Sequence, residues 1–264
     1  MKLKKLIAVA LTAVMTMSLT ACGGGNTTGT TSGGAVGNGK TYNIGICQLV
    51  QHEALDAATK GFKDALTEKL GDKVKFDEQN AQGDSPTCAT IVNSFVSENV
   101  DLILANATAP LQAAATGTTD IPILGTSVTD YGTALNIKDW KGTTGVNVSG
   151  TSDLAPLDQQ AAMIKELFPD KKKVGLYCSA EANSLYQVET IKGYLEKDGY
   201  TCTNYSFVDS NDIASVVSNA AKNSDVIYVP TDNTAASNTE VIRNTCVPAK
   251  VPVVAGEQGI CNGC

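Results

Sequence analysis

The residues best suited to chemistry in this sequence lie in short polar loops that follow apolar β-runs. Hydroxyls and helix N-terminal amides bind a carboxylate, and an aspartate or glutamate accepts a hydrogen bond from an ammonium group. The loops therefore predict a site for a small zwitterion. The candidate ligand-binding residues are Gln48, His52, Asn106, Thr108, Thr126, Thr129, Asp130, Glu181, Asn183, Ser184, Thr231, Asp232, Asn233, Thr234 and Glu257.

Asp232 is the first candidate for the ammonium contact, because it closely follows a buried strand expected over Asp225–Val229. The alternative is that Asp232 caps the helix expected at Ala235–Asn244, a role that Asp fills well. Capping explains individual Ser, Thr, Asn and Asp residues, but not polar loops at all corresponding positions of both halves. Tyr131 and Leu111 are candidates for an apolar floor of the site, or for the core.

An enzyme is the main alternative, with Cys47 or a serine paired with His52 as nucleophile and base. His52 is the single histidine, and the sequence has no G-x-S-x-G motif. Cys261 and Cys264 form a C-x-x-C pair without the helix start or further ligands that redox or metal chemistry needs. The single arginine, Arg243, excludes a bidentate arginine clamp. We expect no catalytic residue, no metal and no cofactor.

The charge of the chain argues against nucleic acid as a partner. The 264 residues carry a net charge of −7. Without Lys2, Lys4 and Lys5, which lie in a segment expected to be removed, 17 basic residues face 27 acidic ones. Phosphate contacts need a basic face, which this balance does not favour. A sugar-responsive repressor with the same two-lobe fold would also need an N-terminal DNA-binding helix pair, where this chain has an export signal.

The first residues predict that the protein is exported and lipid-anchored. A basic start and the apolar run Leu6–Leu19 form a signal peptide over residues 1–21, too short to span a bilayer. Leu19-Thr20-Ala21-Cys22 resembles the lipobox of bacterial lipoproteins, in which the cysteine is acylated. An ordinary secretory signal is the alternative. Residues 22–40 then form an acylated cysteine and a Gly/Ser/Thr-rich tether, and we expect the cell membrane, facing the exterior, as the location.

Strands and helices alternate from residue 41 on, which is typical of α/β units with a parallel sheet. Ile44-Gly45-Ile46 matches Val174-Gly175-Leu176, and similar matches indicate one βαβαβαβ module used twice. The second half predicts helices over 184–197, 212–222 and 235–244. We place a first lobe at 41–148 and a second at 149–264, with a hinge strand within Gly145–Pro156. Ligands of parallel sheets bind at the carboxyl ends of the strands, here between the lobes.

Several polar clusters carry a resemblance to a known family over residues 41–260. They are Gln51-His52-Glu53-Ala54-Leu55-Asp56, Ala105-Asn106-Ala107-Thr108, Gly125-Thr126-Ser127-Val128-Thr129-Asp130, Ser149-Gly150-Thr151-Ser152-Asp153, Glu181-Ala182-Asn183-Ser184 and Val229-Pro230-Thr231-Asp232-Asn233-Thr234. Together they resemble the ABC-transporter substrate-binding lipoproteins of the tryptophan/tyrosine-binding type. The resemblance implies two Rossmann-like lobes of the type I periplasmic-binding-protein kind, with the ligand in the cleft between them.

The same resemblance implies an aromatic or related amino acid that is captured between the lobes and delivered to ABC permease subunits. Family members continue past the turn at Gly256-Glu257, so we expect the chain to be C-terminally truncated and its second lobe incomplete. The expected partners are this small-molecule ligand, the permease and, through Cys22, the lipid bilayer. The alternative is a binding protein for a sugar, nucleoside or signalling molecule that acts as a sensory receptor.

Overall fold

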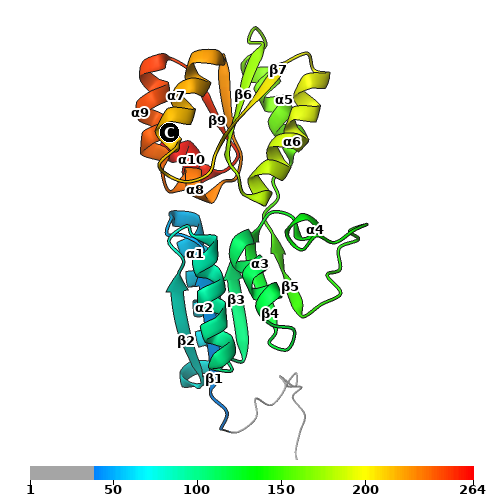
Figure 1. Ribbon diagram of the computed structural model, residues 1–264, viewed down its shortest axis with the longest axis vertical. Coiled ribbons are helices and arrows are strands. Elements are labelled where there is room, and N and C mark those ends of the chain that lie inside the picture. Colours follow the sequence, from blue (N-terminus) through cyan, green and yellow to red (C-terminus); the bar gives the residue numbers. More distant parts are fainter. Residues whose placement is uncertain (1–38) are drawn as a thin grey trace, which may run out of the picture. The chain divides into compact units, whose positions relative to one another are not determined.

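Every strand in the described part of the chain pairs parallel to its neighbours. The computed structural model describes residues 39–264, so the expected signal peptide, the lipidation site Cys22 and most of the tether lie outside the described residues. The strands form two sheets, one in each half of the sequence, and helices connect consecutive strands (Figure 1). This confirms the predicted α/β fold of two lobes with parallel sheets.

The first sheet has the strand order β2-β1-β3-β4-β5. Its strands are β1 (Tyr42–Gln48), β2 (Val74–Asn80), β3 (Leu102–Asn106), β4 (Ile123–Val128) and β5 (Val148–Ser152). The helices of this lobe are α1 (Glu53–Leu70), α2 (Ser85–Ser97), α3 (Thr108–Gly117) and the single turn α4 (Tyr131–Ala134), and a 3₁₀ turn at Gly71–Lys73 follows α1.

The second sheet has the order β7-β6-β8-β9, which repeats the order of the first four strands of the first sheet. Its strands are β6 (Lys173–Ser179), β7 (Thr201–Phe207), β8 (Val226–Val229) and β9 (Val253–Ala255). Its helices are α5 (Leu157–Leu167), α6 (Ala182–Lys197), α7 (Ile213–Asn223), α8 (Asn233–Ala236), α9 (Thr239–Ala249) and α10 (Gln258–Gly263). The structure therefore contains the internal repeat that the matching sequence pieces indicate.

The inner strands are continuous apolar runs because helices and loops cover both faces of a parallel sheet. Ile46 on β1 and Ile103 on β3 are fully buried, as are Leu176 on β6 and Ile227 on β8. The cores around these strands fix where each strand ends. The polar residues that follow the strands are consequently held in place by a rigid frame.

Helix α2 shows how local sequence sets an element. Asp84 is its N-cap and accepts a hydrogen bond from the Thr87 N–H at 2.9 Å. Pro86 lies in the first turn, where its missing N–H costs nothing. A cap and an early proline together define the start of the helix.

The first sheet extends past the boundary expected at residue 148. Strand β5 pairs with β4 through the registers Ile123 with Val148 and Gly125 with Gly150. Both glycines are required here, because a Cβ on Gly125 would lie 2.4 Å from the Tyr131 hydroxyl and one on Gly150 would lie 2.1 Å from it. The segment expected as a hinge strand is therefore the fifth strand of the first lobe up to Ser152.

The single helix expected at Ala235–Asn244 is two helices in the structure, which corrects this expectation. Helix α8 ends at Ala236, and α9 begins at Thr239. The Asn238 amide donates to the Thr234 carbonyl at 2.8 Å and interrupts the helical pattern there. Asn side chains compete with backbone hydrogen bonds in this way. Helix α8 is therefore a separate short turn that begins at Asn233.

Among the helices of residues 39–264, none combines the length and the apolar character needed to cross a bilayer.

Candidate ligand-binding site

A cavity of about 270 Å³ lies where the strand ends of both lobes meet. The first lobe contributes the start of α1 and the ends of β4 and β5, and the second lobe contributes the segments after β8 and β9. This is the edge of a parallel sheet at which ligands bind. The lining residues are His52, Ala54, Leu55, Ser127, Asp153, Ala155, Thr231, Asp232, Asn233, Ala236, Gly256 and Glu257.

The cavity is acidic. Three carboxylates line it, from Asp153, Asp232 and Glu257, and neither lysine nor arginine is part of the lining. Burying a charge without a partner is costly, so a cavity of this composition favours a ligand that brings a cation.

Asp232, the first candidate for an ammonium contact, uses both carboxylate oxygens within the protein. One oxygen accepts a hydrogen bond from the Ser179 N–H at 2.6 Å. The other accepts from the Ala235 N–H at 2.8 Å and thereby caps α8. Asp232 is only 1% exposed. The Asp232 carboxylate thus has a structural role in the cavity wall, because it connects the end of β6 with the start of α8 through hydrogen bonds.

Glu257 is occupied in the same way. Its two oxygens accept hydrogen bonds from the Gly259 N–H at 2.7 Å and the Ile260 N–H at 2.6 Å. Both donors lie in the first turn of α10, so Glu257 is the N-cap of that helix. Two of the three cavity carboxylates therefore stabilise helix starts.

Asp153 is the third carboxylate, and the sequence reasoning did not include it among the candidate site residues. Although the residue is exposed as a whole, its carboxyl group lies among protein atoms, and this desolvation raises its pKa. A hydrogen bond from the Thr129 side chain opposes the shift, and repulsion from Glu257 adds to it. In the described residues, the Asp153 carboxyl accepts a backbone hydrogen bond only from its own N–H. It therefore keeps more free acceptor positions than the carboxylates of Asp232 and Glu257.

The start of α1 offers unpaired backbone donors to the cavity. His52 is the N-cap residue, but its side chain makes no capping hydrogen bond. Ala54 and Leu55, in the first turn, line the cavity. The first N–H groups of a helix have no partner within it and carry a partial positive charge, which suits a carboxylate. By contrast, side-chain carboxylates cap α8 and α10.

His52 instead reaches across to the second lobe. Its Nε2 atom lies 3.2 Å from the Oδ1 atom of Asn233, the first residue of α8. Thr231 lines the cavity next to this pair. The structure thus brings His52, Thr231, Asp232, Asn233 and Glu257 together from the candidate set.

Four further candidates lie beside the cavity rather than in its lining, in the second lobe. Burial raises the pKa of the Glu181 carboxyl to about 7, repulsion from Asp232 adds to the shift, and hydrogen bonds from Thr234 and Asn233 oppose it. In the described part of the chain, Glu181 Oε2 and Asn183 Oδ1 are buried without a partner. Ser184 accepts a hydrogen bond from Ser179, and the Thr234 hydroxyl donates to Glu181 at 3.2 Å.

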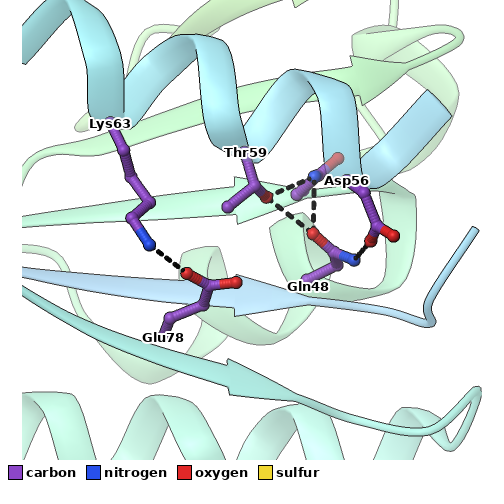
Figure 2. A network of polar contacts seen from close by, with 6 residues as sticks. Gln48, Asp56, Thr59, Lys63 and Glu78 are labelled. Carbon is purple, nitrogen blue, oxygen red and sulfur yellow. Dashed lines mark hydrogen bonds and ion pairs between the residues drawn. The ribbon is translucent and has the colours of Figure 1, made fainter. Parts of the chain in front are cut away.

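Gln48, which Figure 2 shows, and Asn106 belong to a polar network inside the first lobe, and neither residue lines the cavity. The Gln48 amide donates to Asp56 at 2.7 Å, and its oxygen accepts from the Thr59 hydroxyl at 2.6 Å. Asn106 donates to Thr59 at 2.9 Å and to the Leu55 carbonyl at 2.8 Å. Figure 2 also shows the neighbouring ion pair of Lys63 and Glu78. This network anchors the first two turns of α1 to the ends of β1 and β3.

The remaining candidates also serve the first lobe. Thr108 is buried at the start of α3, and the Thr126 carbonyl accepts from the Ala107 N–H at 3.0 Å. Thr129 is buried and donates to Asp153. Asp130 caps α4 through the Thr133 N–H at 2.6 Å. None of the four lines the cavity.

The candidates for an apolar floor are core residues instead. Leu111 is fully buried within α3, and the Tyr131 hydroxyl donates to the Thr151 carbonyl at 3.2 Å. The apolar part of the cavity comes from Ala54, Leu55 and two alanines after β5 and in α8. Small residues at the start of a helix carry no sequence signal for a ligand contact. Ser127 also lines the cavity, and its φ of 54° places it in the left-handed region at the end of β4.

Comparisons with known proteins agree with this geometry. A family model described as "ABC transporter substrate binding protein" matches residues 43–264. The chain is 41% identical to the tyrosine-binding protein of Clostridioides difficile strain R20291, over 83% of this chain and 65% of that protein. It therefore spans about two thirds of the length of that relative.

Two solved structures are informative. An ABC domain from Streptococcus pneumoniae in complex with L-Trp is 35% identical, with a TM-score of 0.79 over 84% of this chain and 76% of that one. A ligand-free, open substrate-binding protein with adhesive properties from Clostridium difficile is 39% identical, with a TM-score of only 0.57 over 83% and 76%. Despite the lower identity, the present arrangement is closer to the L-Trp complex than to the open form.

A leucine-binding protein from Thermotoga maritima, 17% identical with a TM-score of 0.62 over 81% of this chain and 63% of that one, shares the fold alone. This likeness confirms the predicted fold of the type I periplasmic-binding-protein kind. Together with the family match over residues 43–264, it allows a plain statement: the chain belongs to the ABC transporter substrate-binding protein family.

Proposed function

We propose that this protein captures an aromatic amino acid between its two lobes and delivers it to the permease of an ABC importer. We further propose that acylated Cys22 anchors it to the outer face of the cell membrane. The relatives support the ligand class, since one is a tyrosine-binding protein and another was solved with L-Trp. Substrate-binding relatives also make a non-enzymatic role the natural one for this chain.

The observation that carries the proposal is the charge of the cavity. Its lining holds three carboxylates and neither lysine nor arginine. An amino acid brings an ammonium group for such a wall and a carboxylate for the free N–H groups at the start of α1. A volume of about 270 Å³ is near the lower limit for small-molecule pockets, which suits a ligand of this size.

These features suggest an orientation for the ligand. The ammonium group binds Asp153, because the other two cavity carboxylates each accept two backbone hydrogen bonds. The carboxylate faces the first turn of α1 near Ala54 and Leu55. The side chain of the ligand then packs against the alanines of the opposite wall, Ala155 and Ala236. A mostly apolar wall with few polar groups is the common design of small-molecule sites.

The test is calorimetric titration of L-Tyr and L-Trp into the wild type and an Asp153→Asn variant. We expect binding by the wild type, and a loss of affinity of about tenfold or more in the variant, since a hydrogen bond to a charged group contributes about 1.5–3 kcal/mol. Asp158→Asn, an exposed carboxylate in the first turn of α5, is the matched control and should bind as the wild type does. Equal affinities for all three proteins would remove Asp153 from the site.

A thermal-shift screen with sugars and nucleosides tests the ligand class itself. Stabilisation by one of these, and not by any amino acid, would support the alternative ligand class that the sequence leaves open. For the anchor, Cys22→Ala should move the protein from the membrane fraction to the soluble fraction or the medium. Labelling with radioactive palmitate checks this directly, because a variant still labelled as strongly as the parent contradicts acylation at Cys22.

A further inference from the structure

One hydrogen bond joins the side chains of the two lobes across the cavity in residues 39–264. It runs between His52 Nε2 and Asn233 Oδ1, at 3.2 Å. His52 stands at the start of α1 in the first lobe, and Asn233 is the first residue of α8 in the second. The two residues are 181 positions apart in the sequence. Their contact therefore exists only when the lobes approach each other.

The direction of this bond follows from the two atoms that meet. The Oδ1 atom of Asn233 faces His52. An amide oxygen only accepts a hydrogen bond, so Nε2 of His52 is the donor.

His52 has no competing role within its own lobe. Its side chain does not cap α1. Asn233 is 8% exposed, so water has little access to the amide. Both residues line the cavity, and the arrangement of the chain is closer to an L-Trp complex than to a ligand-free, open relative. A hydrogen bond at this place adds to the stability of the closed arrangement around a bound ligand.

We propose that the His52–Asn233 hydrogen bond is a latch that holds the two lobes closed on the ligand. This inference rests on the proposed function and makes His52 and Asn233 positioning residues rather than independent ligand contacts. The latch acts after the ligand has entered, so it slows release and leaves entry unchanged. Differences in affinity of this kind are mostly differences in the dissociation rate.

A double-mutant cycle tests the latch with L-Trp and L-Tyr as ligands. We expect His52→Ala and Asn233→Ala each to lower the affinity about three- to tenfold, the range of a single hydrogen bond. The double variant should lose no more than either single variant, because both remove the same bond. Stopped-flow kinetics should place the loss in the dissociation rate. His52→Gln, which keeps a donor, should recover most of the affinity.

Gln51→Ala is the matched control, since this neighbour is exposed and has no side-chain hydrogen bond in the described residues. It should bind as the wild type does. Losses that multiply in the double variant would overturn the latch, because they indicate two separate ligand contacts. Single variants with unchanged affinity would overturn it as well.

A second readout separates the latch from the ligand class. If the wild type binds neither L-Trp nor L-Tyr, the proposed ligand is wrong, and the double-mutant cycle is then repeated with the sugar or nucleoside that stabilises the wild type in the thermal-shift screen. The two single variants and the double variant should again lose affinity to the same extent. Losses that multiply, or unchanged affinity in the single variants, would overturn the latch for that ligand too.

Discussion

The most direct test of the site geometry is the removal of Asp232. Its carboxylate accepts hydrogen bonds from the Ser179 N–H and the Ala235 N–H, and the residue is 1% exposed. In Asp232→Ala, the lost helix cap costs about 0.5–2 kcal/mol. The Ser179 N–H is left buried without an acceptor, which costs about 1–3 kcal/mol more. We therefore expect the free energy of unfolding to fall by about 1.5–5 kcal/mol.

Asp130→Ala is the control that isolates the second hydrogen bond. Asp130 caps α4 through the Thr133 N–H and accepts no other backbone hydrogen bond in the described structure. It should cost only the cap, about 0.5–2 kcal/mol. Urea denaturation of the ligand-free proteins, followed by circular dichroism, gives both values. A similar cost for the two variants would refute the bridging role of Asp232.

Ligand affinity provides the other half of this test. If Asp232 is structural, Asp232→Asn should weaken amino-acid binding less than Asp153→Asn does, although it is less stable than the wild type. Its amide keeps one oxygen for the Ala235 N–H and turns a donor towards the Ser179 N–H. A stable Asp232→Asn protein with a more than tenfold loss of affinity would show that Asp232 binds the ligand, as the sequence first suggests.

Three further predictions concern stability. Burial raises the pKa of Glu181 to about 7, against an ordinary 4.5, so the ionised carboxylate destabilises the folded state. The free energy of unfolding of the wild type should therefore fall by about 2–3 kcal/mol from pH 5 to pH 8, relative to that of Glu181→Gln. Urea-unfolding free energies that change in parallel with pH in the two proteins would contradict this. In Gly150→Ala, the new Cβ would overlap the Tyr131 hydroxyl, and the free energy of unfolding should fall by at least about 1–3 kcal/mol. In Gly193→Ala, the new Cβ meets open space on α6, and the free energy of unfolding should rise by about 0.5–1 kcal/mol. Melting temperatures that shift in the same direction in both variants would refute this contrast. Thr59→Val, in the network of Figure 2, removes one hydrogen bond from Gln48 and one from Asn106 and should cost about 1–3 kcal/mol. The exposed control Thr116→Val should cost less than about 0.5 kcal/mol in the same urea titration.

The strands and the larger helices could be predicted from the sequence because their signals are local. Apolar runs such as those of β1 and β6 are fully buried, and the repeat between the halves follows from matching spacing. The break between α8 and α9 was missed because it depends on the Asn238 side chain, which turns back to Thr234. No periodicity marks such a bond. The pairing of strand β5 with β4 has no sequence signal, because Gly145–Pro156 is rich in small and polar residues, as a linker is.

The candidate site could be predicted only as a set of loops. Ser, Thr, Asn and Asp are suited both to capping helices and to binding ligands, so the sequence leaves both roles open. The structure divides them by partner: Asp130, Asp232 and Glu257 cap helices, while Asp153 accepts no backbone hydrogen bond from a helix start. That division depends on which loops of the two lobes come together. A single chain position carries no information about this.

The strand order has a consequence for how the chain folds. In each sheet the first strand made lies inside, β1 between β2 and β3 and β6 between β7 and β8. Each later strand adds to an open edge, so no strand has to insert between two neighbours already in place. Parallel pairing still requires a long crossover to close before each strand is gained, which makes folding slow. Each lobe can thus assemble outward from its first strand in the order of synthesis.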